Sequence, residues 1–361
     1  MDQDSNLVIE YTRFIDSDGT LQQTLPDFAD DQCLLSLYQY MLLTRCFDDK
    51  ARRLQKTGKL YTYAPILGQE AVSVGIGTSM KEEDIFCPFY RDCGAQLIRG
   101  VAMSELFNYW SGNEWGNHFR HCQADFPICV PIATQLLHAA GIATAFKLRQ
   151  KKQVAIASCG DGATSKGDFY EALNLAGAWQ LPLIVVINNN QWAISVPREK
   201  QTYAKTLAQK AIAAGFCGEQ VDGNDVVAVK FVIERAIHKA RTGGGPSLIE
   251  ALSYRLSDHT TSDDATRYRS SESLQQAWQQ EPLSRLRKFL LKKQLWSAEQ
   301  EQHYAEHCAH TVATAVHEYL ALPKPALTDL FDYQYATLPI DLSEQRIDAL
   351  ALLKLKEIAP Q

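Results

Sequence analysis

One segment, residues 154–192, constrains the fold of this chain more than any other. It contains an apolar run, the turn Gly160-Asp161-Gly162, a helical stretch, and a second apolar run that leads into the asparagines at 188–190. This succession predicts two adjacent parallel strands joined by a helix. Because strands alternate with helices along the rest of the chain, we expect an α/β fold with a mostly parallel central sheet and helices on both faces.

The polar residues of this segment predict a ligand site. Asp161 follows the first strand, and Asn190 follows the second, 29 residues later. Open α/β sheets bind ligands where the carboxyl ends of neighbouring strands meet. A carboxylate, an amide oxygen and nearby carbonyls form an oxygen-only site that suits Mg²⁺ carrying a diphosphate. Gly160 and Gly162 let the backbone approach phosphate oxygens, and the following helix offers its first amides.

Two other phosphate-binding patterns fit this turn poorly. A dinucleotide-binding turn requires a third glycine three residues after the second, but the next glycine after Gly162 is Gly167. A P-loop ends in Gly-Lys-Ser or Gly-Lys-Thr, whereas the order here is Ser165-Lys166-Gly167. An ordinary strand-to-helix turn that happens to carry an acidic residue is the remaining alternative, and the asparagines at a fixed distance count against it.

The composition argues against several classes of protein. The net charge of −6 is opposite to that of a nucleic-acid surface, which is normally basic. No apolar run approaches the roughly 20 residues that a membrane span needs. The acidic N-terminus differs from signal and transit peptides, so we expect a cytoplasmic location.

The cysteines indicate thiols rather than disulfides. Nine cysteines are scattered along the chain without a Cys-x-x-Cys pair, which fits reduced side chains. His118, His121 and Cys122 form the densest group of metal-binding side chains. No second pair at suitable spacing completes four ligands, so we expect no zinc site there.

The chain is expected to have three regions: a polar N-terminal arm over 1–30 with a small hairpin, a diphosphate-binding α/β domain over 31–325, and a loose, proline-containing extension over 326–361. Periodicity and caps predict further elements. They are a helix from Asp30 to about Gln55, a short strand within 84–91, helices at 102–111 and 133–146, a helix capped by the turn 221–225, a strand at 247–252, a loop at 256–270 and charged helices within 271–320.

The turn and the asparagines together resemble the thiamine-diphosphate motif, in which Gly-Asp-Gly is followed after a helix by Asn-Asn. Its continuation over residues 190–195 resembles the alpha subunits of the decarboxylating first component of 2-oxo acid dehydrogenase complexes. Residues 68–71, 199–202, 205–210 and 263–269 resemble the Gram-positive type of pyruvate dehydrogenase alpha subunit. The resemblance covers about residues 30–340 and implies the thiamine-diphosphate-binding fold.

The resemblance implies thiamine diphosphate and Mg²⁺ as cofactors. It gives Ile132 the place of the apolar wedge that bends the cofactor. Trp192 stands where many relatives have tyrosine, and its carbonyl would be the third metal ligand. The implied cofactor contacts are Tyr90, Arg91, Val130, Ile132, Gly160, Asp161, Gly162, Ala163, Asn190, Trp192 and His259, with Asp161, Asn190 and Trp192 on the metal.

His259 matches the active-site histidine of this family. It lies in the loop 256–270 with hydroxyl and carboxylate neighbours. Imidazole suits proton transfer at neutral pH, so we interpret His259 as the catalytic residue that positions and exchanges protons with the substrate. Thr260 occupies the place of a regulatory phosphoserine in eukaryotic relatives, and nothing in the sequence indicates its modification.

The resemblance also implies partners and a reaction. Alpha subunits of this family lack the glutamate that activates the cofactor, because the beta subunit supplies it, so an α₂β₂ heterotetramer is expected. The implied reaction is oxidative decarboxylation of pyruvate with acyl transfer to the lipoyl group of an acyltransferase component. Branched-chain 2-oxo acids and acetoin are the alternative substrates. A scaffold without cofactor and a metal-free nucleotide-binding module are rival functions. The intact Asp161 and Asn190 argue against the scaffold, and the missing third glycine argues against the nucleotide-binding module.

Overall fold

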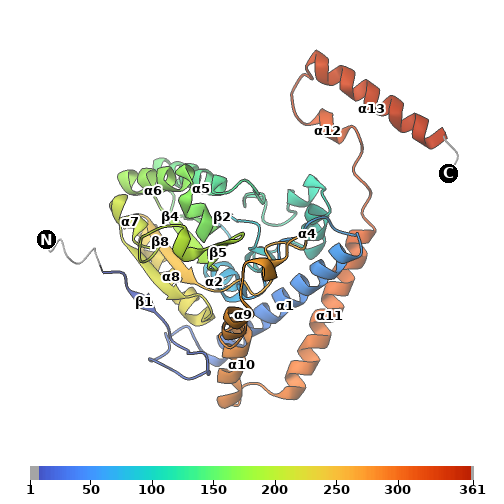
Figure 1. The fold of residues 1–361 in the computed structure, drawn as a ribbon. Helices are drawn as coiled ribbons and strands as arrows, with labels where there is room; N and C mark the ends of the chain where they lie inside the picture. Colours follow the sequence, from blue (N-terminus) through green and yellow to red (C-terminus); the bar gives the residue numbers. More distant parts are fainter. Residues whose placement is uncertain (1–7, 359–361) are drawn as a thin grey trace. The chain divides into compact units, whose positions relative to one another are not determined.

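The fold is described from a computed structural model, in which residues 8–358 are placed (Figure 1). Contacts divide the chain into two compact units, Met1–Val316 and His317–Gln361. The first unit carries every residue that the sequence assigned to the site. The boundaries at 30 and 325 expected from the sequence stay a prediction.

A six-stranded parallel sheet forms the centre of the first unit. Its order is β1 (Tyr11–Thr12), β7 (Gly218–Asp222), β8 (Ser247–Leu252), β4 (Leu183–Asn189), β3 (Ala155–Gly160) and β2 (Ile85–Cys87). The strands β5 (Trp192–Ala193) and β6 (Val196–Pro197) form a separate antiparallel pair. The expected α/β fold with a parallel sheet is therefore confirmed.

The helices account for most of the remaining chain. The α-helices are α1 (Asp31–Lys56), α2 (Glu70–Ser79), α3 (Cys93–Ile98), α4 (Met103–Trp110), α5 (Thr134–Leu148), α6 (Gly167–Trp179), α7 (Lys210–Ala213), α8 (Val226–Arg241), α9 (Ser271–Trp278), α10 (Pro282–Lys292), α11 (Ala298–Leu320), α12 (Asp329–Asp332) and α13 (Ile340–Ile358). Short 3₁₀ turns are η2 (Glu114–Asn117), η3 (Asp161–Ser165), η4 (Arg198–Lys200) and η5 (Ala265–Arg267). Within residues 8–358, no helix has the length and apolar character of a membrane span.

The central strands β3 and β4 are buried on both faces of the sheet, which explains why their side chains are largely apolar. In β4, Ile184 and Val186 join a core that includes residues of α2 and α8. Val185 and Ile187 point to the other face, where they join a second core with residues of α5 and α6. Successive side chains of a strand point to opposite faces, so one apolar run supplies both cores.

Several helices and strands lie where the sequence predicted them. The helix predicted from Asp30 is α1, and the Asp30 side chain accepts a hydrogen bond from the Cys33 amide at 2.7 Å. The helix predicted after the turn 221–225 is α8, which is capped by Asp225. These caps satisfy amides that a helix leaves unpaired at its start. The predicted strand at 247–252 is β8.

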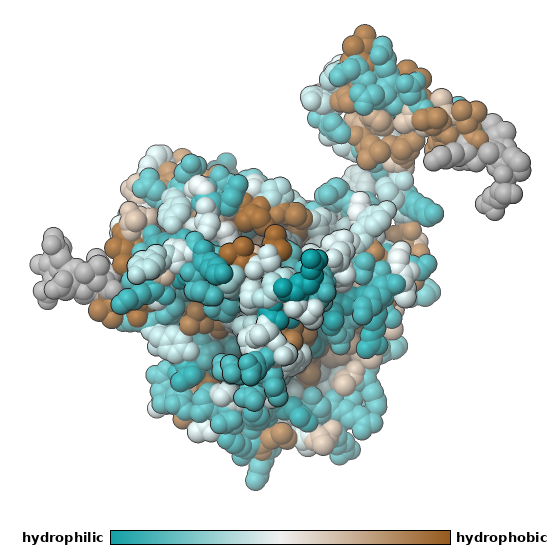
Figure 2. All heavy atoms as spheres, in the orientation of Figure 1, coloured by the Kyte–Doolittle hydropathy of each residue, from teal (hydrophilic) through white to brown (hydrophobic). Residues whose placement is uncertain are grey.

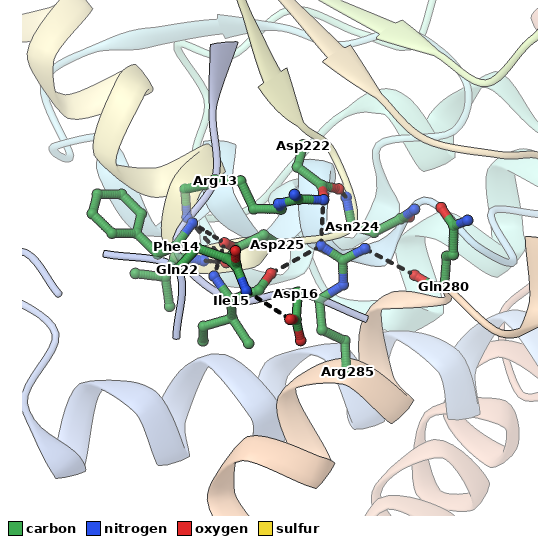
Figure 3. Close-up of polar contacts among 12 residues, drawn as sticks. Arg13, Phe14, Ile15, Asp16, Gln22, Asp222, Asn224, Asp225, Gln280 and Arg285 are labelled. Carbon is green, nitrogen blue, oxygen red and sulfur yellow. Dashed lines mark hydrogen bonds and ion pairs between the residues drawn. The ribbon is translucent and has the colours of Figure 1, made fainter. Parts of the chain in front are cut away.

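The N-terminal arm is more ordered than the sequence suggested. The predicted hairpin is present as a bridge between Ile15 and Leu21, but the arm also adds β1 to the edge of the sheet. Figure 3 shows what anchors it: the carboxylate of Asp225 accepts hydrogen bonds from the amides of Phe14 and Ile15, both at 2.7 Å. Arg285 of α10 donates to the Ile15 carbonyl at 3.1 Å. The arm is thereby part of the folded unit.

The second unit contains the 19-residue helix α13, within the loose, proline-containing extension that the sequence indicated after residue 325. Pro339 directly precedes this helix, where a proline interrupts no helical hydrogen bond, and its carbonyl accepts from the Ser343 amide at 2.9 Å. The residues that follow are mainly strong helix formers. The looseness of the extension stays a prediction.

Replacing Gly177 of α6 with alanine is expected to destabilise the fold by about 1–3 kcal/mol. A Cβ atom at Gly177 would lie 1.9 Å from the carbonyl oxygen of Ala214, so α6 would have to move away from the end of α7. The free energy of unfolding in urea measures the loss. Gly141 of α5 is the matched control, since nothing lies within 4 Å of a Cβ atom added there; Gly141→Ala should gain about 0.5–1 kcal/mol. Equal behaviour of the two variants would contradict this packing argument.

Candidate functional site

The carboxyl ends of β3 and β4 bring Asp161 and Asn190 to the same edge of the sheet. Gly160 is paired with Asn188 in the parallel register, and each site residue follows within two positions of this pair. Both side chains are buried, with 1% and 4% of their surface exposed. The glycine turn opens the 3₁₀ turn η3, and α6 begins only at Gly167. The sequence had suggested a helix directly after the turn.

Asp161 is a buried carboxylate without a cationic partner among residues 8–358. Its Oδ2 accepts a hydrogen bond from Nε2 of Gln201 at 2.5 Å. Burial raises the pKa of Asp161, which the hydrogen bond from Gln201 opposes. A buried carboxylate is costly unless a cation compensates it, so this position suits a bound metal ion.

Asn190 and Trp192 offer further oxygen atoms beside this carboxylate. Nδ2 of Asn190 donates to Oε1 of Gln69 at 2.9 Å, and its Oδ1 accepts from the Trp192 amide at 3.2 Å. These bonds fix the orientation of the amide. The Trp192 carbonyl accepts only a long hydrogen bond, 3.4 Å, from Arg255. Each oxygen retains a lone pair that a hard cation could use.

A pocket of about 120 Å³ lies beside the glycine turn. Seven of the residues that the sequence assigned to cofactor binding line it, and they come from four separate segments of the chain. Its lining consists of Phe89, Tyr90, Cys129, Val130, Ile132, Ala133, Gln135, Gly160, Gly162, Ala163, Ala193, Ile194 and His259. The walls are thus mostly apolar, with few polar groups, as is usual for small-molecule sites.

Unusual backbone conformations gather at this pocket. Ala133, Gln191 and Ile194 have positive φ angles of 71°, 73° and 55°. Ala133 and Ile194 line the pocket, and Gln191 directly follows Asn190. The left-handed conformation is especially unfavourable for a branched side chain such as that of Ile194. Such strain persists where the surrounding structure enforces it, commonly at binding sites.

Two buried arginines flank His259. Arg91 donates to the Pro65 carbonyl and to both Nδ1 and the carbonyl oxygen of His259, at 3.0 and 2.6 Å for the latter two. Arg255 donates to Nδ1 of His259 at 3.3 Å and to the Tyr268 hydroxyl at 2.7 Å. Neither guanidinium, within the part of the chain that the structure describes, pairs with a carboxylate. Burial and the nearby Arg91 lower the pKa of Arg255 to about 10. Two cations without an ion-pair partner among the described residues make this side of the site attractive to an anion.

The arginines fix the state of the His259 ring. Arginine can only donate hydrogen bonds, so Nδ1 of His259 is an acceptor and the proton of the neutral ring resides on Nε2. Burial, followed by the charges of Arg91 and Arg255, lowers the pKa of His259 to about 3. The ring of Tyr90 lies edge-on to the imidazole, with centroids 6.5 Å apart. His259 is therefore a neutral donor at physiological pH.

The depressed pKa of His259 predicts a pH-dependent stability. The unfolded chain takes up a proton near pH 6.5 and the folded chain only near pH 3, so stability falls as the pH is lowered from about 6.5 towards 3. In His259→Asn this fall should be shallower, as measured by urea unfolding at pH 7, 6, 5 and 4.5. His310→Asn, at an exposed position of α11, is the control and should follow the unsubstituted chain. An unchanged slope in His259→Asn would contradict the assigned neutral state.

The structure adds residues that the sequence reasoning missed. Arg255, Gln201 and Gln69 all contact predicted site residues. Arg255 lies four residues before His259 in the sequence. This short separation was the one feature that could have indicated Arg255 as a site residue. Gln69 and Gln201 lie in two segments that resemble the family, 68–71 and 199–202, but only the folded chain brings them to Asn190 and Asp161.

The histidine and cysteine group noted in the sequence lies elsewhere. His121 and Cys122 line a different groove, beside the ion pair of Arg99 and Asp125. In residues 8–358 there is no group of three or more His, Cys, Asp or Glu side chains that could hold a metal ion. The candidate metal position at Asp161 depends instead on amide and carbonyl oxygens.

Comparison with known proteins places these features in context. The sequence model of a family described as "Dehydrogenase E1 component" matches residues 38–328. A protein of Staphylococcus aureus named "Pyruvate dehydrogenase E1 component subunit alpha" is 39% identical over 345 residues, which are 95% of this chain and 93% of the relative. Proteins of the same name from Bacillus cereus and Bacillus subtilis are 40% identical over 326 residues, 90% of this chain and 87% of each relative.

Proposed function

This chain belongs to the dehydrogenase E1 component family, and from that premise we propose that it is the alpha subunit of a pyruvate dehydrogenase. Its reaction is the thiamine-diphosphate-dependent oxidative decarboxylation of pyruvate, with transfer of the acyl group to a lipoyl group. Relatives of about 40% identity that carry this name support the assignment. The resemblance of the loop 256–270 to branched-chain enzymes makes a branched-chain 2-oxo acid the alternative substrate.

The observation that carries the proposal is the pair of buried arginines beside His259, which lines the same pocket as the glycine turn. Arg91 is 1% exposed and Arg255 is fully buried, and their hydrogen bonds go to neutral acceptors. A diphosphate supplies the missing negative charge. The turn provides room for it: a Cβ atom on Gly160 would face the pocket near Phe89 at 3.9 Å, and one on Gly162 would lie 2.7 Å from Cβ of Ala193. The amides of Gly162 and Ala163 are the proposed further contacts.

The residues also fit Mg²⁺. Asp161 would contribute a carboxylate oxygen, Asn190 its Oδ1 and Trp192 its carbonyl, and Mg²⁺ prefers such hard ligands together with phosphate oxygens. The uncompensated burial of Asp161 is relieved by a divalent cation. The site therefore has a negative side and a positive side. The carboxylate of Asp161 would bind the metal ion, and the guanidinium groups of Arg91 and Arg255 would attract the diphosphate.

Thiamine diphosphate, when bound, supplies the carbanion chemistry of decarboxylation. The protein positions it and controls protons. Ile132 would present apolar surface to the cofactor's rings and Val130 would contact it through its backbone, while His259 holds a proton on Nε2 that can form a hydrogen bond to the substrate side. Arg91 and Arg255 keep this ring oriented and neutral. A positioned hydrogen-bond donor of this kind contributes about 10²–10³ to a rate.

A partner subunit is required for a complete site. The pocket of about 120 Å³ is smaller than the roughly 300 Å³ and more of typical ligand sites. Its rim exposes apolar side chains: Val130 is 52%, Ile132 41% and Ile194 57% exposed, and Figure 2 shows hydrophobic surface near β5. We assign this surface to a beta subunit in an α₂β₂ heterotetramer, with a lipoyl-bearing acyltransferase as the next partner. The scattered cysteines, which form no Cys-x-x-Cys pair, support a cytoplasmic location.

The test is an assay of the assembled enzyme. The chain is co-produced with a beta subunit, and ferricyanide reduction is measured with pyruvate and with 3-methyl-2-oxobutanoate, with thiamine diphosphate and Mg²⁺ present or omitted. Turnover that needs both cofactors and favours pyruvate is expected. A preference for the branched substrate would support the alternative. Absence of turnover in a well-formed heterotetramer would overturn the proposal.

A further inference from the structure

We propose that Gln201 is a positioning residue for the metal-binding carboxylate of Asp161: it holds one oxygen and leaves the other to face the cation. Gln201 follows η4, and it lies 40 residues beyond Asp161 in the chain. This inference rests on the proposed function, because the cation concerned is the Mg²⁺ of that site.

The geometry of Gln201 is fixed by two acceptors. Nε2 donates to Oδ2 of Asp161 at 2.5 Å and to the Val196 carbonyl at 3.2 Å. A carboxylate and a carbonyl only accept, so the nitrogen of the Gln201 amide must face them. The other amide atom, Oε1, is buried and has no hydrogen-bond partner among the described residues. The orientation of this side chain is therefore unambiguous, and one acceptor is left over.

The anchored oxygen determines how Asp161 can bind a metal ion. A carboxylate on a single bond to its Cβ can rotate, and a donor held at Oδ2 stops this rotation with Oδ1 directed elsewhere. Groups that orient a metal ligand typically contribute about 10–100-fold to metal affinity. Mg²⁺ keeps several of its waters in proteins, and such a water supplies the donor that Oε1 of Gln201 lacks.

The same amide ties an exposed segment to the site. Residues 198–206 turn back on themselves, and Arg198 donates to the carbonyls of Thr202 and Ala204 at 3.4 and 2.9 Å. Tyr203 at the tip is fully exposed. Gln201 connects this segment to Asp161, so binding of the cation should also stabilise the segment.

The first test measures the affinity of the assembled heterotetramer for Mg²⁺. The enzyme is saturated with thiamine diphosphate, and Mg²⁺ is titrated into it in an isothermal calorimeter. Gln201→Met keeps the length of the side chain and removes the donor, and it should weaken Mg²⁺ binding about 10–100-fold. Gln209→Ala is the matched control: its Oε1 accepts from the Thr206 amide within the same segment and is not bonded to Asp161. This variant should bind Mg²⁺ as the unsubstituted enzyme does.

The second readout is limited trypsin digestion at Arg198, Lys200 and Lys205. Addition of Mg²⁺ and thiamine diphosphate should slow cleavage of the unsubstituted enzyme and of Gln209→Ala. In Gln201→Met the same addition should leave the cleavage rate unchanged. Unchanged Mg²⁺ affinity in Gln201→Met would overturn the inference and leave the proposed function intact. Failure of the unsubstituted heterotetramer to bind Mg²⁺ and thiamine diphosphate would instead overturn the proposed function.

Discussion

Replacing Asp161 with asparagine is expected to lower the turnover of the assembled enzyme at least about a thousandfold, equivalent to about 4 kcal/mol. The asparagine would keep the shape of the side chain and remove the negative charge that attracts the cation. The buried position of Asp161 makes this charge strong, because little water screens it. Turnover with pyruvate and the Mg²⁺ dependence of thiamine diphosphate binding are the measurements, and both should be severely reduced.

The fold should survive this replacement. Burial raises the pKa of Asp161, which means that the charged carboxylate lowers the free energy of unfolding. A neutral amide at this position should therefore be tolerated in the absence of metal. Asp49→Asn is the control, since Asp49 only pairs with Arg52 on the surface of α1 and contributes at most about 1 kcal/mol. If Asp161→Asn retained metal-dependent turnover near that of Asp49→Asn, the assignment of the metal ligand would be wrong.

Replacing His259 with asparagine is expected to reduce acyl transfer about 10²–10³-fold while thiamine diphosphate still binds. Asparagine offers an acceptor to Arg91 and Arg255, which now contact Nδ1 of His259, but it lacks the Nε2 donor. Binding should depend mainly on the arginines and on Asp161, and chemistry on the imidazole. The measurements are the dissociation constant of thiamine diphosphate by calorimetry and the rate of transfer to a lipoyl domain.

His310→Asn provides the comparison for a surface histidine and should leave both quantities unchanged. Loss of cofactor binding in His259→Asn, with transfer reduced only in proportion, would assign the residue a purely structural role. His259→Ala adds a second measure, because it also removes the acceptor for the arginines. It should bind thiamine diphosphate more weakly than His259→Asn does.

Much of the fold could be predicted because its signals are local. The central strands β3 and β4 are buried on both faces, so they appear in the sequence as apolar runs, and the glycines and asparagines mark where these runs end. Asp161 and Asn190 could be paired from the sequence alone, since adjacent parallel strands must present their carboxyl ends together. The paired strands confirm this reasoning.

The remaining features depend on contacts between distant residues. β1 is two residues long and gains its place only by pairing with β7 and by the bonds of the arm to Asp225. Gln201 reaches Asp161 because the strands β5 and β6 fold the chain back. No periodicity in the sequence records such contacts. The pocket assignments therefore relied on the family resemblance, and the roles of their residues stay predictions until they are measured.

The attachment of the N-terminal arm has a consequence for synthesis of the chain. Phe14 leaves the ribosome early, yet its amide bonds to Asp225, which is 211 residues away. At about 5–20 residues per second, the arm waits about 10–40 s for this partner and still longer for Arg285. During translation the first strand of the finished sheet is thus among the last to be placed, and the arm closes a sheet that the later strands have already assembled.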